Sequence, residues 1–174
     1  VLNGGRAVYY PCPESQNFNP DPVAIEALIT PRTRAIVIIN PNNPTGAVYP
    51  RAVLEAIARI AEKYHLLVLA DEIYDQMTYE GAEFTPMATL VHHTLCCTMS
   101  GLSKVYRACG YRVGWVSFSG TVDLSEIDTA IENASRSFIT VRSRAVAASP
   151  SGIGLGPTIS RTSACSGWAS SAEM

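Results

Sequence analysis

The sequence has little charge and no long apolar run, and these two shortages exclude several classes of protein. Charged residues make up 16% of the 174 residues, and the formal net charge is −2. The basic residues are scattered rather than clustered, so we expect no nucleic-acid partner. The longest uninterrupted apolar runs, "AIVII" and "LLVLA", have five residues each. They are far too short to span a bilayer, so we expect no membrane partner either.

Cysteine is present, but not in patterns that build a site. There is no C-x-x-C pair and no ligand-type spacing with histidine, which argues against a zinc site and a disulfide framework. An odd number of mostly strand-like cysteines is typical of a reducing compartment and predicts a cytoplasmic protein. The adjacent His92 and His93 are interpreted as a loop between a helix and a strand, and we expect no metal. The five cysteines are Cys12, Cys96, Cys97, Cys109 and Cys165.

Up to residue 120 the sequence alternates between strand and helix patterns. Helices are expected at "DPVAIEALI", where proline follows an aspartate cap, and at "PRAVLEAIARIAEKY", whose apolar residues have helical spacing. Strands are expected at "RAVYYPC", "RAIVIIN", "HLLVLADEIY" and "TLCCTMSG". The middle two are apolar enough to be covered on both faces. This alternation predicts an α/β fold with a mostly parallel sheet flanked by helices.

The composition changes near residue 120. Most serines follow this point, and "ASPSGIGLGPTISRTSACSGWASSAEM" is rich in serine and glycine with almost no acidic residue, a composition typical of disorder. We therefore predict a partial domain at 1–120 and an atypical tail at 121–174. The tail is interpreted as frameshifted or mis-spliced, with an unusual natural linker as the alternative. Because the chain begins at Val1 without methionine, we expect the domain to be incomplete at both ends.

Three polar segments directly follow three of the expected strands. "NPNNPTG" follows "AIVII", "DEIYD" follows "LLVLA", and "SGLSK" follows "LCCTM". Ligands of parallel α/β sheets gather at the carboxyl ends of the strands. We therefore expect the three segments to build one site.

Lys104 and Arg112 are the first candidate residues of this site. An amine at the end of a buried strand is suited to form a Schiff base when its surroundings keep part of it uncharged. A guanidinium matches phosphate with two hydrogen bonds, so the pair suggests an aldehyde cofactor that carries a phosphate. Taken alone, Lys104 is better interpreted as a surface lysine, and Arg112 as an ordinary exposed or ion-paired arginine.

Asp71, Tyr74 and Asn43 are the other candidates. A carboxylate at the mouth of a buried strand needs a cation, and a protonated pyridine nitrogen would provide one for Asp71. Tyr74 and the amide of Asn43 could bond the same ring, and Asn43 also a substrate carboxylate. The alternatives are a helix cap for Asp71, a partly buried aromatic for Tyr74 and a plain turn for Asn43. Glu72 and Asp75 are interpreted as solvated neighbours.

These motifs resemble a known family. "NPNNPTG", "DEIY" and "SGLSKVYRACGYRVGW", in this order and at these separations, resemble class I, fold-type-I pyridoxal-phosphate aminotransferases. "ITPRTRAIVIINPNNPTGAVY" and "GLSKVYRACGYRVGW" are most similar to the alanine-aminotransferase-like subgroup. The resemblance covers about residues 1–120 and implies a partial large domain of the pyridoxal-phosphate transferase fold.

The resemblance implies a role for each candidate. Lys104 would form the Schiff base with pyridoxal 5'-phosphate and move the α-proton, and Asp71 would pair with the pyridine nitrogen. Tyr74 and Asn43 would bond the phenolic oxygen, with Asn43 also near the substrate carboxylate. Arg112 would bind the phosphate. One departure stands out: many members have serine three residues before the lysine, where this chain has Gly101.

The activity that the resemblance implies is amino-group transfer between a small amino acid, with alanine favoured, and a 2-oxo acid. Two alternatives stay open: a pyridoxal-phosphate lyase or synthase of the same fold, and a truncated, catalytically inactive product. The arginine that clamps the substrate carboxylate in this family is not recognisable, so amino-acid specificity cannot be inferred. The family also implies a homodimer.

Overall fold

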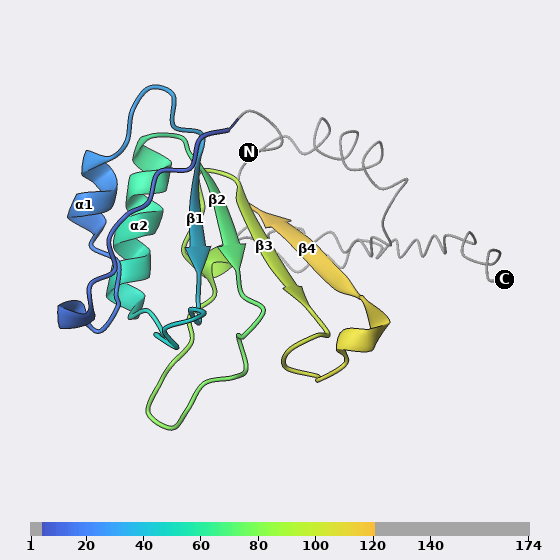
Figure 1. Cartoon of the computed structure of the whole chain (residues 1–174). Helices are drawn as coiled ribbons and strands as arrows, with labels where there is room; N and C mark the ends of the chain where they lie inside the picture. The colour runs from blue at the N-terminus through green and yellow to red at the C-terminus, as the bar shows by residue number, and fades with distance from the viewer. Residues whose placement is uncertain (1–4, 121–174) are drawn as a thin grey trace, which may run out of the picture.

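The computed structural model describes residues 5–120, which form one sheet with helices beside it (Figure 1). The predicted tail, 121–174, lies outside the described residues. The elements run in the order η1 (Glu14–Gln16), α1 (Pro22–Ala27), β1 (Ala35–Ile39), α2 (Arg51–Lys63), β2 (Leu67–Asp71), η2 (Met87–Thr89), β3 (Cys96–Gly101), η3 (Cys109–Tyr111) and β4 (Gly114–Ser119), where η marks a short 3-10 helix.

The sheet has the strand order β1-β2-β3-β4. The first three strands are parallel, with Ile39 opposite Asp71 and Asp71 opposite Met99. β4 runs antiparallel to β3 and brings Gly114 opposite Gly101. The predicted α/β fold with a mostly parallel sheet and flanking helices is therefore confirmed.

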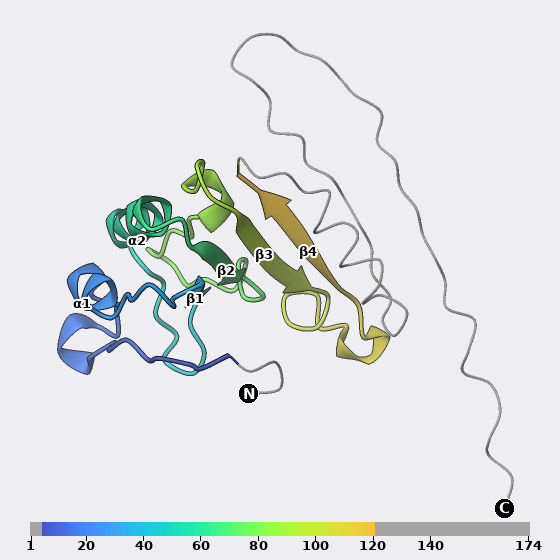
Figure 2. The same cartoon turned by 90° about the horizontal axis from the view of Figure 1, so that it is seen from above.

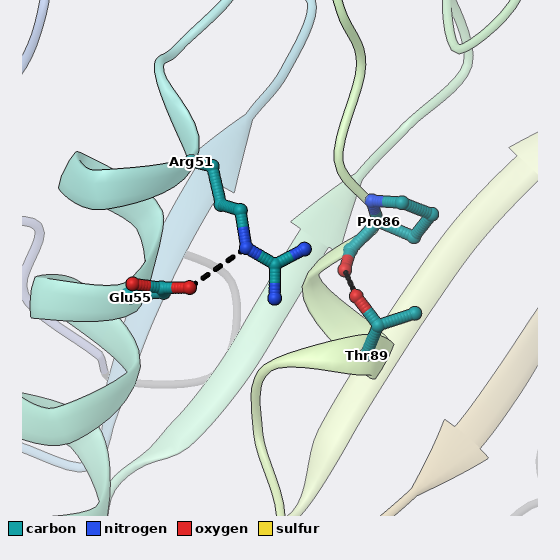
Figure 3. A network of polar contacts seen from close by, with 4 residues as sticks. All are labelled: Arg51, Glu55, Pro86 and Thr89. Carbon is teal, nitrogen blue, oxygen red and sulfur yellow. Dashed lines mark hydrogen bonds and ion pairs between the residues drawn. The ribbon is translucent and has the colours of Figure 1, made fainter.

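The helices form where the sequence predicts them, and for the expected reasons. Asp21 caps α1, because its carboxylate accepts a hydrogen bond from the Val23 amide at 2.9 Å, and Pro22 occupies the first turn. α2 buries one apolar stripe, which includes Leu54 and Ile57. Its exposed side begins with an ion pair of 2.7 Å between Arg51 and Glu55, one turn apart (Figure 3).

The core lies between the two helices and one face of the sheet. Figure 2 shows α1 and α2 together on the same side of β1 and β2. Isoleucine and leucine side chains of α2 meet the inward residues of the strands there. The buried residues that form this core include Ile25, Ile36, Ile38, Tyr49, Leu54, Ile57, Val68, Ala70, Met87, Val91 and Cys96.

Two predictions about strands are wrong. "RAVYYPC" forms no strand, because Pro11 within it and Pro13 directly after it have no amide hydrogen to donate to a ladder. It reaches β1 through a side chain instead: the Tyr10 hydroxyl donates to the carbonyl of Val37 at 2.8 Å. β1 is also not covered on both faces by the described residues. Ile36 and Ile38 are buried, but Val37 between them is 48% exposed, since both helices lie on one side.

Candidate active site

The site is built at one edge of the sheet, where the three parallel strands end. Figure 1 shows the arrowheads of β1, β2 and β3 pointing to the same edge, with the loop after each strand beyond it. "NPNNPTG" follows β1, "DEIYD" overlaps the end of β2, and "SGLSK" overlaps the end of β3. The placement expected for the three polar segments is confirmed.

The turn after β1 presents Asn43 outward. Asn42 holds the turn from within: its side-chain oxygen accepts hydrogen bonds from the Thr45 hydroxyl at 2.8 Å and the Thr45 amide at 3.4 Å. Gly46 adopts φ 74°, which favours glycine because it has no Cβ. Asn43 is left exposed, and its side-chain nitrogen donates to the Tyr74 hydroxyl at 3.2 Å. Two segments 31 positions apart therefore meet here.

A buried tyrosine supports this turn from below. Tyr49 is 1% exposed, and its amide donates to the side-chain oxygen of Asn40 at 2.8 Å. Its hydroxyl interacts with the Cys12 thiol and the Asn42 side chain, while burial raises the pKa of the phenol. Tyr49 is not among the residues expected from sequence to belong to the site. In the sequence, Tyr49 is a tyrosine just after a polar turn. This pattern does not tell a buried tyrosine that supports the turn from an exposed one.

Asp71 is the last residue of β2 and is half-buried. One carboxylate oxygen accepts a hydrogen bond from the amide of Ile73 at 3.2 Å, which fixes the start of the following turn. The alternative considered from sequence, a capping role, therefore describes part of what this carboxylate does. A role toward a cofactor stays a prediction.

Glu72 is not the solvated neighbour that the sequence suggests. Its side chain is buried, and one carboxylate oxygen accepts a hydrogen bond from the Met87 amide at 2.8 Å. The reason is strand alternation. Successive side chains point to opposite faces of a strand, so Glu72 points into the protein whereas Asp71, just before it, faces the other side. Burial raises the pKa of Glu72 to about 7, the Met87 hydrogen bond opposes this, and Asp75 and Asp71 add to it.

Lys104 lies in the loop after β3, with its ammonium nitrogen 5.9 Å from the centre of the Tyr74 ring. This distance is within the range of a cation–π interaction. The side chain is exposed, so residues 5–120 do not provide the shelter expected from sequence. Lys104 follows the end of β3 by three residues and stands beyond the sheet rather than on it.

No contact described in residues 5–120 joins Arg112 to the other candidates, and the Asp71 carboxylate likewise bonds only to the amide of Ile73. Arg112 ends η3 with φ 51°, and its guanidinium donates to the carbonyl of Cys109 at 3.2 Å. The side chain is exposed. Among residues 5–120, Asn43, Tyr74 and Lys104 are thus brought together, Asp71 stands at the same strand ends, and the role of Arg112 stays a prediction.

The departure at Gly101 has a steric cause. A Cβ at this position would lie 2.9 Å from the carbonyl oxygen of Val113 and 3.1 Å from the Cα of Gly114. Both atoms belong to backbone that pairs with β3 as β4 begins. Serine would therefore require the two strands to separate, which explains glycine at this position.

Within residues 5–120, no group of three or more histidine, cysteine, aspartate or glutamate side chains is arranged to hold a metal ion. In the same part of the chain, no helix is long and apolar enough to cross a membrane.

Comparison with known proteins decides the family. The model of the family "Aminotransferase class I and II" matches residues 1–153. The chain belongs to this family. The family match continues past Gly120, where the sequence analysis ends the resemblance, whereas the matches to individual relatives below cover about 119 residues. The boundary at residue 120 stays a prediction.

Several relatives of this chain are named as alanine or glutamate-pyruvate aminotransferases. The chain is 51% identical over 119 residues to the glutamate-pyruvate aminotransferase AlaA of Escherichia coli, covering 68% of this chain and 29% of AlaA. It is 49% identical over 119 residues to the alanine aminotransferase of Mycobacterium tuberculosis, covering 68% and 28%. The aminotransferase chain thus spans less than a third of the curated relatives it matches.

Solved structures agree with the family. An aminotransferase from Escherichia coli superposes with a TM-score of 0.74 at 47% identity, covering 78% of this chain and 34% of that one. An alanine aminotransferase from Pyrococcus furiosus superposes with a TM-score of 0.72 at 45% identity, covering 76% and 34%. The recognised class I aminotransferase of alanine-like type is therefore confirmed for this part of the chain.

Proposed function

We propose that the protein containing this chain is a pyridoxal-phosphate-dependent aminotransferase that moves an amino group between alanine and a 2-oxo acid. The observation that carries the proposal is the meeting of Asn43, Tyr74 and Lys104 from three separate loops at one sheet edge. The names of the relatives from Escherichia coli and Mycobacterium tuberculosis favour alanine as the amino-acid substrate.

The donor set at this edge fits the polar groups of pyridoxal 5'-phosphate. An amide and a phenol in contact, Asn43 and Tyr74, suit its phenolic oxygen, because both can donate a hydrogen bond to it. A half-buried carboxylate, Asp71, suits its pyridine nitrogen, and an amine, Lys104, suits its aldehyde. Arg112 is proposed to hold the phosphate.

When bound, the cofactor supplies an electron sink for the carbanion formed at the substrate α-carbon. The chain's own residues have separate tasks. Asp71 keeps the ring nitrogen protonated by its negative charge. Asn43 and Tyr74 orient the ring, and Asn43 also approaches the substrate carboxylate. Lys104 holds the cofactor covalently at rest and carries the α-proton during the reaction.

A product assay on the 174-residue chain separates the three open possibilities. An aminotransferase forms more than one molecule of pyruvate from alanine per site only when 2-oxoglutarate is added as the acceptor, and it then forms glutamate in equal amount. A lyase or synthase forms product from the amino acid alone, and a truncated inactive chain forms none. Lys104→Ala should abolish the activity, whereas Lys63→Ala, which changes a lysine paired with Glu26 on the helices, should not.

We further propose a cytoplasmic location and a homodimer. Four free cysteines in the described part of the chain suit a reducing compartment. The homodimer rests on the family, and the measured mass of the purified protein in solution tests it. A monomeric mass at micromolar concentration would contradict it.

A further inference from the structure

Glu72 is the only charged side chain that is buried in residues 5–120, with 6% of its surface exposed. It lies between Asp71 and the turn that carries Tyr74. The proposed reaction assigns no task to it. A buried carboxyl group without a cation is costly, so its place in the fold needs a reason.

Three hydrogen bonds make Glu72 the point where three segments join. Its amide donates to the carbonyl of Met99 in β3 at 2.9 Å, and its carbonyl accepts from the amide of Asp75 at 3.0 Å. Its carboxylate accepts from the amide of Met87 at the start of η2 at 2.8 Å. Residue 72 therefore ties the end of β2 to β3, to the turn that holds Tyr74, and to η2.

The segment between these ties, 73–86, is exposed at its tip and buried near its end. Tyr79 is 91% exposed and Met77 is 50% exposed, whereas Thr85 and Met87 are buried. The Thr89 hydroxyl donates to the carbonyl of Pro86 at 2.7 Å, which closes the first turn of η2 (Figure 3). The hydrogen bond from the Met87 amide to the Glu72 carboxylate joins the end of this segment, at η2, to its beginning, at the turn that carries Tyr74.

We propose that Glu72 is a positioning residue for Tyr74, acting as a pin that closes the base of the 73–86 segment. With the pin closed, the turn places the Tyr74 phenol within 3.2 Å of Asn43 and beside Lys104. With the pin open, the turn keeps its short-range bonds, such as that from the Met77 amide to the Tyr74 carbonyl at 2.8 Å, and the exposed bond from Asn43 to the Tyr74 hydroxyl.

The pin should open more readily as the pH rises, because burial in the closed state favours the protonated form of the Glu72 carboxyl group. The titratable groups that face it are Asp71, Asp75 and the Cys96 thiol of β3, and no cation among the described residues pairs with it. The pKa of Glu72 is about 7 when buried, against an ordinary value of 4.5. Opening exposes the Glu72 carboxyl group to water and returns its pKa toward 4.5, so at a pH between 4.5 and about 7 opening releases a proton. It should become easier as the pH rises from about 4.5 to about 7, and level off above.

Amide hydrogen exchange on the 174-residue chain without cofactor tests the pin. The reporters are the amides of Met87 and Met77, with Val68 in the middle of β2 as the marker of global unfolding. After correction for the intrinsic rates, the opening constants of Met87 and Met77 should exceed that of Val68 at every pH. They should rise about tenfold per pH unit between pH 5 and pH 7 and then level off.

Two variants and a matched control separate positioning from plain stability. Glu72→Gln keeps the acceptor without the charge, so Met87 and Met77 should stay protected and their pH slope should vanish. Glu72→Ala should open both amides at every pH, by a larger factor than Val68. Glu62→Gln is the control, because Glu62 also accepts backbone hydrogen bonds, from His92 and His93, but away from this segment. It should leave the slope at Met87 unchanged.

The proposal is overturned if Met87 and Met77 open no more readily than Val68, or if Glu72→Gln keeps the slope. If a variant fails to fold, the unmodified chain decides alone: a flat profile from pH 5 to pH 7 contradicts the pin. The link to catalysis rests on the proposed function. The exchange measurement needs no cofactor, so a failure of the pin and a failure of the proposed function give different results.

Discussion

The side-chain nitrogen of Asn43 lies 3.2 Å from the phenol oxygen of Tyr74, although 31 positions of sequence separate the two residues. Neither side chain is placed by its own segment alone. The first depends on a proline-rich turn after β1, and the second on a turn after β2. Their contact is the clearest sign that the loops at the strand ends form one site.

Tyr74→Phe should weaken the binding of pyridoxal phosphate, because it removes the phenol hydroxyl proposed to bond the phenolic oxygen. The loss of one hydrogen bond of about 0.5–1.5 kcal/mol corresponds to a roughly 2- to 12-fold higher dissociation constant. Titration of the cofactor absorbance measures it. Tyr79→Phe is the control, since Tyr79 is 91% exposed. Equal affinities in the two variants would remove Tyr74 from the site.

Tyr49→Phe should lower the free energy of unfolding by about 1–3 kcal/mol, because the half-buried Cys12 and Asn42 groups lose their common partner, the buried Tyr49 hydroxyl. Urea denaturation monitored by circular dichroism measures this. Tyr111→Phe changes a hydroxyl on a residue that is 76% exposed and should cost little. If Tyr49→Phe is as stable as the unmodified chain, the hydroxyl does not support the turn.

Gly101→Ser should destabilise the fold by about 1–3 kcal/mol, because its Cβ would press on the backbone of the neighbouring strand. Gly110→Ser provides the matched comparison, since a Cβ there meets no atom within 4 Å. The thermal midpoints of the two variants should differ clearly, with Gly101→Ser lower. Equal midpoints would mean that the β3–β4 pair adjusts freely.

Glu62→Gln should lower the stability at neutral pH. Burial acts to raise the pKa of Glu62, but the hydrogen bonds from the His92 and His93 amides outweigh it, and the net pKa is lowered. A carboxyl group with a lowered pKa stabilises the fold above its ordinary pKa, and this contribution fades as the pH falls through the folded value. The difference between the variant and the unmodified chain should therefore be present at pH 7 and shrink toward pH 3. A difference that is constant with pH would contradict the electrostatic origin.

Much of the fold is predictable because local signals and burial agree. Asp21 followed by Pro22 marks the start of α1, and the apolar stripe of α2 matches the side that is buried. The parallel direction of the first three strands, and the gathering of the polar segments at one edge, follow from the alternation of strands and helices. The strand expected at "RAVYYPC" does not form. Its β-branched and aromatic residues favour a strand, but Pro11 and Pro13 have no amide hydrogen for strand pairing.

The site is less predictable, since exposure depends on segments distant in sequence. Lys104 follows an apolar strand, which suggests shelter, yet in residues 5–120 no second layer covers it. Glu72 stands among polar residues, which suggests solvent, yet it faces η2 across a loop of fourteen residues, 73–86. In both cases the local sequence predicts the backbone conformation, but it does not predict which distant segment covers the side chain.

The attachment point of pyridoxal phosphate tests the central claim most directly. The chain is mixed with the cofactor, reduced with borohydride, digested, and the modified peptide is identified by mass spectrometry. The account predicts one major modification, at Lys104, and its disappearance in Lys104→Ala without transfer to Lys63. Modification spread over both lysines, or none at all, would show that the three loops do not bind one cofactor in this chain.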